Sequence, residues 1–238
     1  MRQVVPWLQQ QEHLISLPGL CKLLQRLRVS YKRGRRHVHS PDLDYDKKLA
    51  VIAQAQEQCR REPGRFVFLY GDELTFFKLP RVGFGYAGTG CKGLKATGTG
   101  TQLRRIAACL DITTGAVLAR QRSKFTVQEM YYFFRFVEKH YPQAERIYIA
   151  VDNWPVHFHP FVLESLQQQR SRIHLLRLPT YAPWTNPTEK VWLKLSREVL
   201  DQHPFGLDWK GLQQAIADWF ALLEHGSPSL LHFVGLSP

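Results

Sequence analysis

The stretch RFVFLYGDE, residues 65–73, is an apolar run that stops at a glycine and Asp72. A second stretch, RIYIAVDN (146–153), has the same form and stops at Asp152. Apolar runs of this length are typical of strands buried on both faces of a sheet. Catalytic groups gather at strand ends in open α/β sheets, so parallel neighbours would bring the two carboxylates to one edge. Aspartate also ends many strands only because it suits turns.

Further strand and helix patterns surround these two runs. We interpret LTFFKL (74–79) as a hairpin partner of the first run, and RRIAACLDI (104–112) with AVLARQ (116–121) as a strand pair around a Thr-Gly turn. Residues 127–141 predict a helix with one apolar face. The remaining expected elements are a helix near 159–170, a strand at 172–178, and two closing helices near 187–201 and 209–224.

The order of these elements predicts the fold class. A meander of three strands followed by two helix crossovers gives a mixed five-stranded sheet flanked by helices. This is the order of the ribonuclease H-like α/β fold, of the retroviral-integrase type. We expect residues 63–238 to form this domain and residues 1–62 to form a separate basic segment.

The N-terminal segment combines a short helix with a basic arm. Ser16 can cap a helix whose leucines share one face, and residues 44–61 predict a connecting helix that ends at Pro63-Gly64. The basic residues suggest phosphate contacts with DNA, although a charge run can also be a solvated helix face. The candidate DNA-binding residues are Lys22, Arg26, Arg28, Lys32, Arg33, Arg35 and Arg36.

Composition favours a polyanionic partner. The 238 residues contain 32 Lys plus Arg against 20 Asp plus Glu, a net charge of +12, which points first to nucleic acid. The four cysteines form no CxxC pair, so neither a zinc site nor a disulfide framework is indicated. The first residues lack the apolar core of a signal peptide, and we expect a cytoplasmic protein.

The third informative stretch is LLRLPTYAPWTNPTEKVWLKL (175–195). It runs from a strand through three prolines into a helix. Asn186 suits the N-cap, Pro187 the first helical position, and Glu189 follows three residues after the cap. Glu189 could therefore be a capping-box glutamate. It could instead complete a carboxylate trio with Asp72 and Asp152.

The segments GDELTF, AVDNWPVH and LPTYAPWTNPTEKVW together resemble the three motifs of bacterial insertion-sequence transposases related to the Tc/mariner group, the DDE-superfamily endonucleases. The resemblance covers about residues 10–238. It implies that Asp72, Asp152 and Glu189 are the catalytic, metal-binding triad. It gives supporting roles to Asn153, His157, Asn186 and Trp192. Glu73 is expected to point to the opposite face from Asp72 and stays outside the triad.

The same resemblance implies the chemistry. The trio would hold two Mg²⁺ or Mn²⁺ ions for strand cleavage at element ends, followed by attack of the freed 3′-hydroxyl on target DNA. The electrostatics agree, because two carboxylates about 4 Å apart repel by about 4 kcal/mol at an effective dielectric constant of about 20. All-oxygen ligands favour Mg²⁺ over zinc. The implied partners are double-stranded DNA, as terminal inverted repeats and target, and a second copy of the chain. The expected location is the prokaryotic cytoplasm, with the nucleoid.

Two other functions remain open at this stage. The chain could be a catalytically silent or domesticated DNA-binding protein derived from a transposase, or another ribonuclease H-like nuclease such as a junction resolvase. The relatives carry a bipartite helix-turn-helix region before the catalytic domain, of which only the last helix and arm are recognisable here. We therefore expect an N-terminally shortened chain. The intact trio favours an enzyme, and the third motif disfavours a resolvase.

Overall fold

The computed structural model describes residues 4–11, 15–29, 39–82 and 98–236. The chain forms two compact units, Met1–Val38 and His39–Pro238. The first unit contains α1 (Val4–Gln10) and α2 (Leu17–Arg26). The predicted cap is confirmed, because the Ser16 side chain accepts a hydrogen bond from the Gly19 N–H. Along the leucine face only Leu20 is buried, whereas Leu23 and Leu27 are exposed.

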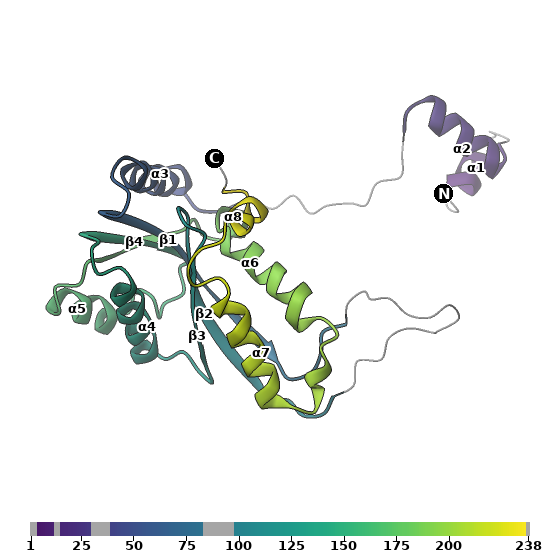
Figure 1. Ribbon diagram of the computed structural model, residues 1–238. Helices are drawn as coiled ribbons and strands as arrows, with labels where there is room; N and C mark the ends of the chain where they lie inside the picture. Colours follow the sequence, from purple (N-terminus) through teal and green to yellow (C-terminus); the bar gives the residue numbers. More distant parts are fainter. Residues whose placement is uncertain (1–3, 12–14, 30–38, 83–97, 237–238) are drawn as a thin grey trace. The chain divides into compact units, whose positions relative to one another are not determined.

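The second unit is built on a mixed five-stranded sheet (Figure 1). The strand order β3-β2-β1-β4-β5 confirms the predicted ribonuclease H-like arrangement. β1 is antiparallel to β2 and parallel to β4, and β4 is parallel to β5. The strands are β1 (Phe66–Phe77), β2 (Leu103–Asp111), β3 (Val117–Arg122), β4 (Arg146–Val151) and β5 (Ile173–Arg177).

The hairpin predicted for residues 74–79 is wrong. Leu74–Phe77 continues β1, which pairs with β2 without interruption from Leu69–Asp111 to Phe77–Leu103. The sequence offers a physical reason, because no glycine, proline or asparagine between Asp72 and Phe77 favours a reversal. β1 therefore extends past Asp72 and carries that residue inside the strand. The strand pair around Thr114-Gly115 is confirmed, since β2 and β3 pair antiparallel.

Helices cover both faces of the sheet (Figure 1). α4 (Val127–His140) and α5 (Pro160–Gln168) pack on one face through a core that includes Leu69, Phe134 and Ile149. On the other face lie α6 (Thr188–Leu195), α7 (Trp209–Ala221) and α8 (Pro228–Val234), with Val191 and Ile216 in their core. A short 3-10 turn, η1 (Pro183–Thr185), precedes α6, and another, η3 (Pro204–Gly206), precedes α7.

The end of the chain differs from the prediction in two respects. The helix expected to reach residue 201 changes at Ser196 into a π-helical turn, η2 (Ser196–Leu200), where the Leu200 carbonyl accepts the Arg81 N–H at 3.1 Å. A third closing helix, α8, was not expected. It has seven residues, too few for its apolar spacing to be read as a helical period, and Ser227 caps it by accepting the Leu230 N–H.

The connecting helix α3 (Tyr45–Arg61) belongs to the second unit. It buries Ile52, Ala55 and Cys59 in a third core cluster together with Phe68 of β1. The boundary expected between residues 62 and 63 thus differs from the division between 38 and 39, because the apolar face of α3 packs on the sheet. Within the described ranges, no helix combines the length and apolar character needed to cross a bilayer.

Candidate active site

Asp72 and Asp152 emerge at the same edge of the sheet. The parallel register of β1 and β4 pairs Tyr70 with Ala150, and each aspartate is the second residue after that pair. β4 ends at Val151 while β1 continues, so Asp72 stands where the neighbouring strand gives way to a loop. Gly71 permits this close pairing, because a Cβ there would lie 2.8 Å from Val151 Cγ1.

Both carboxylate oxygens of Asp72 accept hydrogen bonds. Trp192 Nε1 donates to Oδ2 at 2.9 Å, and the Glu73 backbone N–H donates to Oδ1 at 2.9 Å. Burial raises the pKa of Asp72 to about 7, against the opposing Trp192 bond, and the negative charges of Glu73 and Glu189 raise it further. A nearby cation would stabilise the ionised form of this carboxyl and so lower its pKa.

His157 lies between two acidic side chains. Its imidazole is fully buried, with Nε2 2.9 Å from Glu73 Oε1 and Nδ1 3.1 Å from Asp152 Oδ1. Burial alone would lower its pKa, but the charges and hydrogen bonds of Glu73 and Asp152 raise the pKa of His157 to about 10. The raised pKa favours the protonated imidazolium, which can pair with both carboxylates.

Asp152 is held in its ionised form. Burial favours the neutral acid, but hydrogen bonds from His157 and from the Trp154 backbone N–H at 2.9 Å outweigh it and keep the pKa of Asp152 below its usual value. The side chain is 57% exposed. Asp152 thus offers a fixed negative charge to the solvent side of the site.

Glu73, Asp152 and His157 place three potential metal-ligand atoms within 4.8 Å of one another. This spacing alone would suit a metal ion. In the metal-free site, however, the raised pKa of His157 favours the protonated imidazole, which donates through both nitrogens. The geometry then describes an ion-pair chain, buried at His157 and open to solvent at Asp152, that orients Asp152.

Glu189 lies at the start of α6. The preceding residues bind this helix to β1: Asn186 Nδ2 donates to the Gly71 carbonyl at 3.2 Å, and Thr188 Oγ1 donates to the Tyr70 carbonyl at 3.1 Å. A capping box would direct the Asn186 N–H to the Glu189 carboxylate, but this N–H donates to the Pro183 carbonyl. The Glu189 side chain is thus available to the site, and burial together with the charge of Asp152 raises its pKa.

The loop between β5 and α6 lines the same cavity as the three carboxylates. Asn153 Nδ2 donates to the Leu178 carbonyl at 2.8 Å and to Thr180 Oγ1 at 3.1 Å. Thr180 is also bound by residues before α3: its N–H donates to Asp42 Oδ2 at 2.7 Å, and its carbonyl accepts from Ser40 Oγ at 2.5 Å. Asn153, Asp42 and Ser40 together hold the loop at Thr180.

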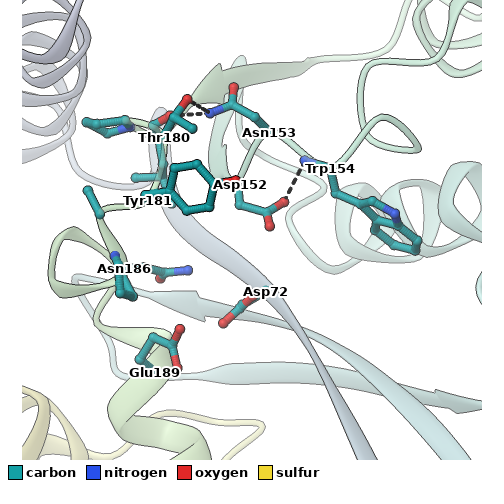
Figure 2. A pocket seen from close by; sticks show the side chains of 12 residues that line it. Asp72, Asp152, Asn153, Trp154, Thr180, Tyr181, Asn186 and Glu189 are labelled. Atoms are coloured by element: carbon teal, nitrogen blue, oxygen red, sulfur yellow. Dashed lines mark hydrogen bonds between the residues drawn. The ribbon is translucent and has the colours of Figure 1, made fainter. Parts of the chain in front are cut away.

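The three carboxylates border a single open cavity of about 410 Å³ (Figure 2). Figure 2 shows Asp72, Asp152 and Glu189 around a common space beside the loop that carries Thr180, Tyr181 and Asn186. These acidic groups offer only oxygen atoms, which suit hard divalent cations such as Mg²⁺ and Mn²⁺. The complete lining is Asp72, Asp152, Asn153, Trp154, Leu178, Pro179, Thr180, Tyr181, Ala182, Pro183, Asn186 and Glu189.

The candidate DNA-contacting residues divide into two groups. Lys22 and Arg26 are exposed on α2, and Arg28 is exposed just after it. The arm residues Lys32, Arg33, Arg35 and Arg36 lie outside the described residues. Phosphate contacts by either group remain a prediction.

Sequence reasoning missed two contributors to the site. Glu73 was set aside because its side chain should face away from Asp72, which it does, but it reaches Asp152 through His157. The Ser40–Asp42 clasp on Thr180 was also missed, because nothing in the sequence links residues separated by about 140 positions. The observation that identifies Glu73 as part of the site is the contact between its carboxylate and His157, the histidine of DNWPVH.

A mixed sheet of this strand order, with carboxylates from two parallel strands and a following helix at one cavity, defines a ribonuclease H-like domain. The chain belongs to the DDE superfamily endonuclease family, which matches residues 67–208. That match contains all three carboxylates.

One curated relative is the insertion element IS630 uncharacterized 39 kDa protein of Shigella sonnei, 22% identical over 186 residues. The aligned part covers 78% of this chain and 53% of the relative. The chain therefore spans about half the length of the curated relative that it matches.

Solved structures of Mos1 transposase share the fold. A Mos1 paired-end complex with the left transposon end has a TM-score of 0.65 at 17% identity, over 96% of this chain and 68% of that one. A mariner Mos1 paired-end complex with Mg has a TM-score of 0.67 at 14% identity, with 96% and 70% covered. The Mos1 catalytic domain alone has a TM-score of 0.52 at 12% identity, with 87% and 91% covered.

Proposed function

We propose that this protein is a DNA transposase that cuts DNA strands at element ends and joins the freed 3′-hydroxyl to target DNA. The observation that carries the proposal is the convergence of Asp72, Asp152 and Glu189 on one open cavity. Family membership and the fold shared with Mos1 transposase support the same chemistry.

Asp72, Asp152 and Glu189 are the residues proposed to hold two Mg²⁺ or Mn²⁺ ions. The raised pKa values of Asp72 and Glu189 support a cation at this position, because both follow from burial and from neighbouring negative charge. When bound, such ions stabilise the charge on a phosphate and activate water or a hydroxyl. A Mos1 paired-end complex is described with Mg and another with Mn.

The other residues of the site are proposed to keep these carboxylates in place. Trp192 fixes one oxygen of Asp72, and His157 with the Trp154 N–H fixes Asp152. Asn186 and Thr188 bind the start of α6 to β1 and so set the position of Glu189. Such positioning keeps catalytic groups within the narrow geometric range that phosphoryl transfer needs.

DNA is the proposed substrate and partner. The net charge of +12 gives the chain a strong attraction for phosphate backbones. The N-terminal basic residues are proposed to contact DNA and the unit around the sheet to perform the reaction. One Mos1 structure is a paired-end complex with the left transposon end, and we extend this to two copies of the present chain on paired DNA ends.

A cleavage assay tests the proposal. The full chain is incubated with DNA that carries the inverted repeats flanking its gene, in Mg²⁺ or Mn²⁺. We expect metal-dependent strand cuts at the repeat ends from the wild type and none from Glu189→Ala. Glu164→Ala is the matched control, because Glu164 is exposed on α5, outside the cavity lining. DNA binding without cleavage by the wild type would instead favour a catalytically silent DNA-binding protein.

A further inference from the structure

An aromatic ring stands exposed at the mouth of the acidic cavity. Tyr181 belongs to the loop between β5 and α6 and lines the same cavity as Asp72, Asp152 and Glu189. Its exposed fraction is 75%, and within residues 39–82 and 98–236 its hydroxyl has no hydrogen-bond partner. Figure 2 shows the ring extending from the loop toward the carboxylates. The ring therefore contributes little to the packing of the core within residues 39–82 and 98–236.

The backbone of Tyr181 is strained. Its φ of +52° is in the left-handed region, which a bulky residue rarely adopts and which costs on the order of 1–3 kcal/mol. The preceding Thr180 is held in place, because Asp42, Ser40 and Asn153 bind its N–H, carbonyl and hydroxyl. The following Ala182 is buried and accepts the Thr185 hydroxyl at 2.7 Å. Strain maintained by so many bonds points to a functional placement of the ring.

We propose that Tyr181 stacks against an unpaired nucleobase beside the phosphate that the acidic trio binds, an inference that rests on the function proposed above. A nucleotide whose phosphate meets the trio would carry its base toward the loop wall. Aromatic side chains bind bases face to face regardless of base identity. Bases in the interior of a duplex stack on neighbours on both sides, whereas an unpaired base has a face free for this ring. The substrate at the cavity is then DNA opened next to the cut.

Photo-crosslinking with binding measurements tests this stacking. The probes are two DNAs of one sequence, a flush duplex and a duplex with a short unpaired 3′ end, each carrying 5-iododeoxyuridine in the terminal segment. Binding is measured in Ca²⁺ for wild type, Tyr181→Ala, Tyr181→Phe and the control Tyr132→Ala. Tyr132 is an exposed tyrosine of α4 that does not line the acidic cavity.

We expect the wild type to prefer the unpaired end and to crosslink it at Tyr181. Tyr181→Ala should weaken binding of that DNA by about ten- to a hundredfold, the loss of one base–aromatic stack, with flush-duplex affinity unchanged. Tyr181→Phe and Tyr132→Ala should behave as wild type. If Tyr181→Ala bound the unpaired end as tightly as wild type does, or if the crosslink formed at a residue other than Tyr181, the proposal would be wrong. A chain that shows the Tyr181-dependent preference but never cuts DNA would retain the stacking and refute the transposase chemistry.

Discussion

Glu73 Oε1 lies 2.9 Å from His157 Nε2, on the face of β1 opposite to the one that Asp72 uses. His157 is fully buried, and the Glu73 side chain is 16% exposed. Adjacent residues of one strand therefore serve one site in two ways. Asp72 lines the cavity, whereas Glu73 balances the charge of the imidazolium that orients Asp152.

Glu73→Ala should destabilise the fold by on the order of 3 kcal/mol, because it leaves half of a buried ion pair without its partner. Glu73→Gln should cost less, since the amide oxygen can still accept from His157. Urea denaturation of both variants beside Glu164→Ala, an exposed substitution expected within about 0.5 kcal/mol of wild type, measures this. Equal stability of Glu73→Ala and wild type would rule out the proposed charge balance.

Asp152→Ala should abolish metal-dependent cleavage and leave the affinity for DNA nearly unchanged. The reason is that Asp152 offers its charge to the cavity, while the affinity comes mainly from basic residues that meet the phosphate backbone. Cleavage and equilibrium binding are measured on the same DNA. A joint loss of cleavage, binding and stability would show that Asp152 has a structural role instead.

Asp72→Asn should gain stability relative to wild type as the pH of the metal-free protein rises through neutral. The folded-state pKa of Asp72 is raised from 3.8 to about 7, so its contribution to stability is fully present below its unfolded value and is lost as the pH rises through about 7. The amide can accept only one of the two hydrogen bonds that the carboxylate accepts, so the prediction concerns the change with pH: the melting temperature of the variant relative to wild type should rise by several degrees between about pH 4 and about pH 8. Thermal melts in a chelator check this, and a difference between the two melting temperatures that is the same at both pH values would contradict it.

DNA binding should weaken steeply with salt. Each phosphate contact contributes a slope of about −0.9 to the dependence of log affinity on log salt concentration. Lys22→Ala and Arg26→Ala should each reduce the slope by about 1 and weaken all DNA sequences alike. A salt titration by fluorescence anisotropy measures both effects. An affinity that salt leaves unchanged would remove the assignment of α2 to DNA.

Much of the fold could be predicted from apolar runs and their limits. FVFLYGD and RIYIAVDN are long and uninterrupted, so their strand character was clear. The order of the elements, a meander followed by two helix crossovers, predicted the mixed sheet in which these two strands pair in parallel. The course of β1 beyond Asp72 was not clear, because LTFF fits a continued strand as well as a returning one. The seven residues of α8 are too few to show a helical period.

The three acidic residues could be predicted from their places in the sequence, since Asp72 and Asp152 each end an apolar run and Glu189 follows Asn186-Pro187. In the structure Asp152 follows β4, Glu189 stands at the start of α6 and Asp72 lies inside β1, and all three line one cavity. The contacts that hold them were not predictable, since Trp192 reaches Asp72 across 120 positions and Asp42 reaches Thr180 across 138. Contacts of that separation depend on tertiary packing, which one sequence does not reveal.

The most direct test of the central claim is the position of Mn²⁺ in crystals of the full chain bound to DNA. We predict anomalous scattering peaks at metal–ligand distance from carboxylate oxygens of Asp72, Asp152 and Glu189, and their loss in Glu189→Ala. A peak held instead by Glu73 and His157, or no peak at the cavity in saturating Mn²⁺, would contradict the account.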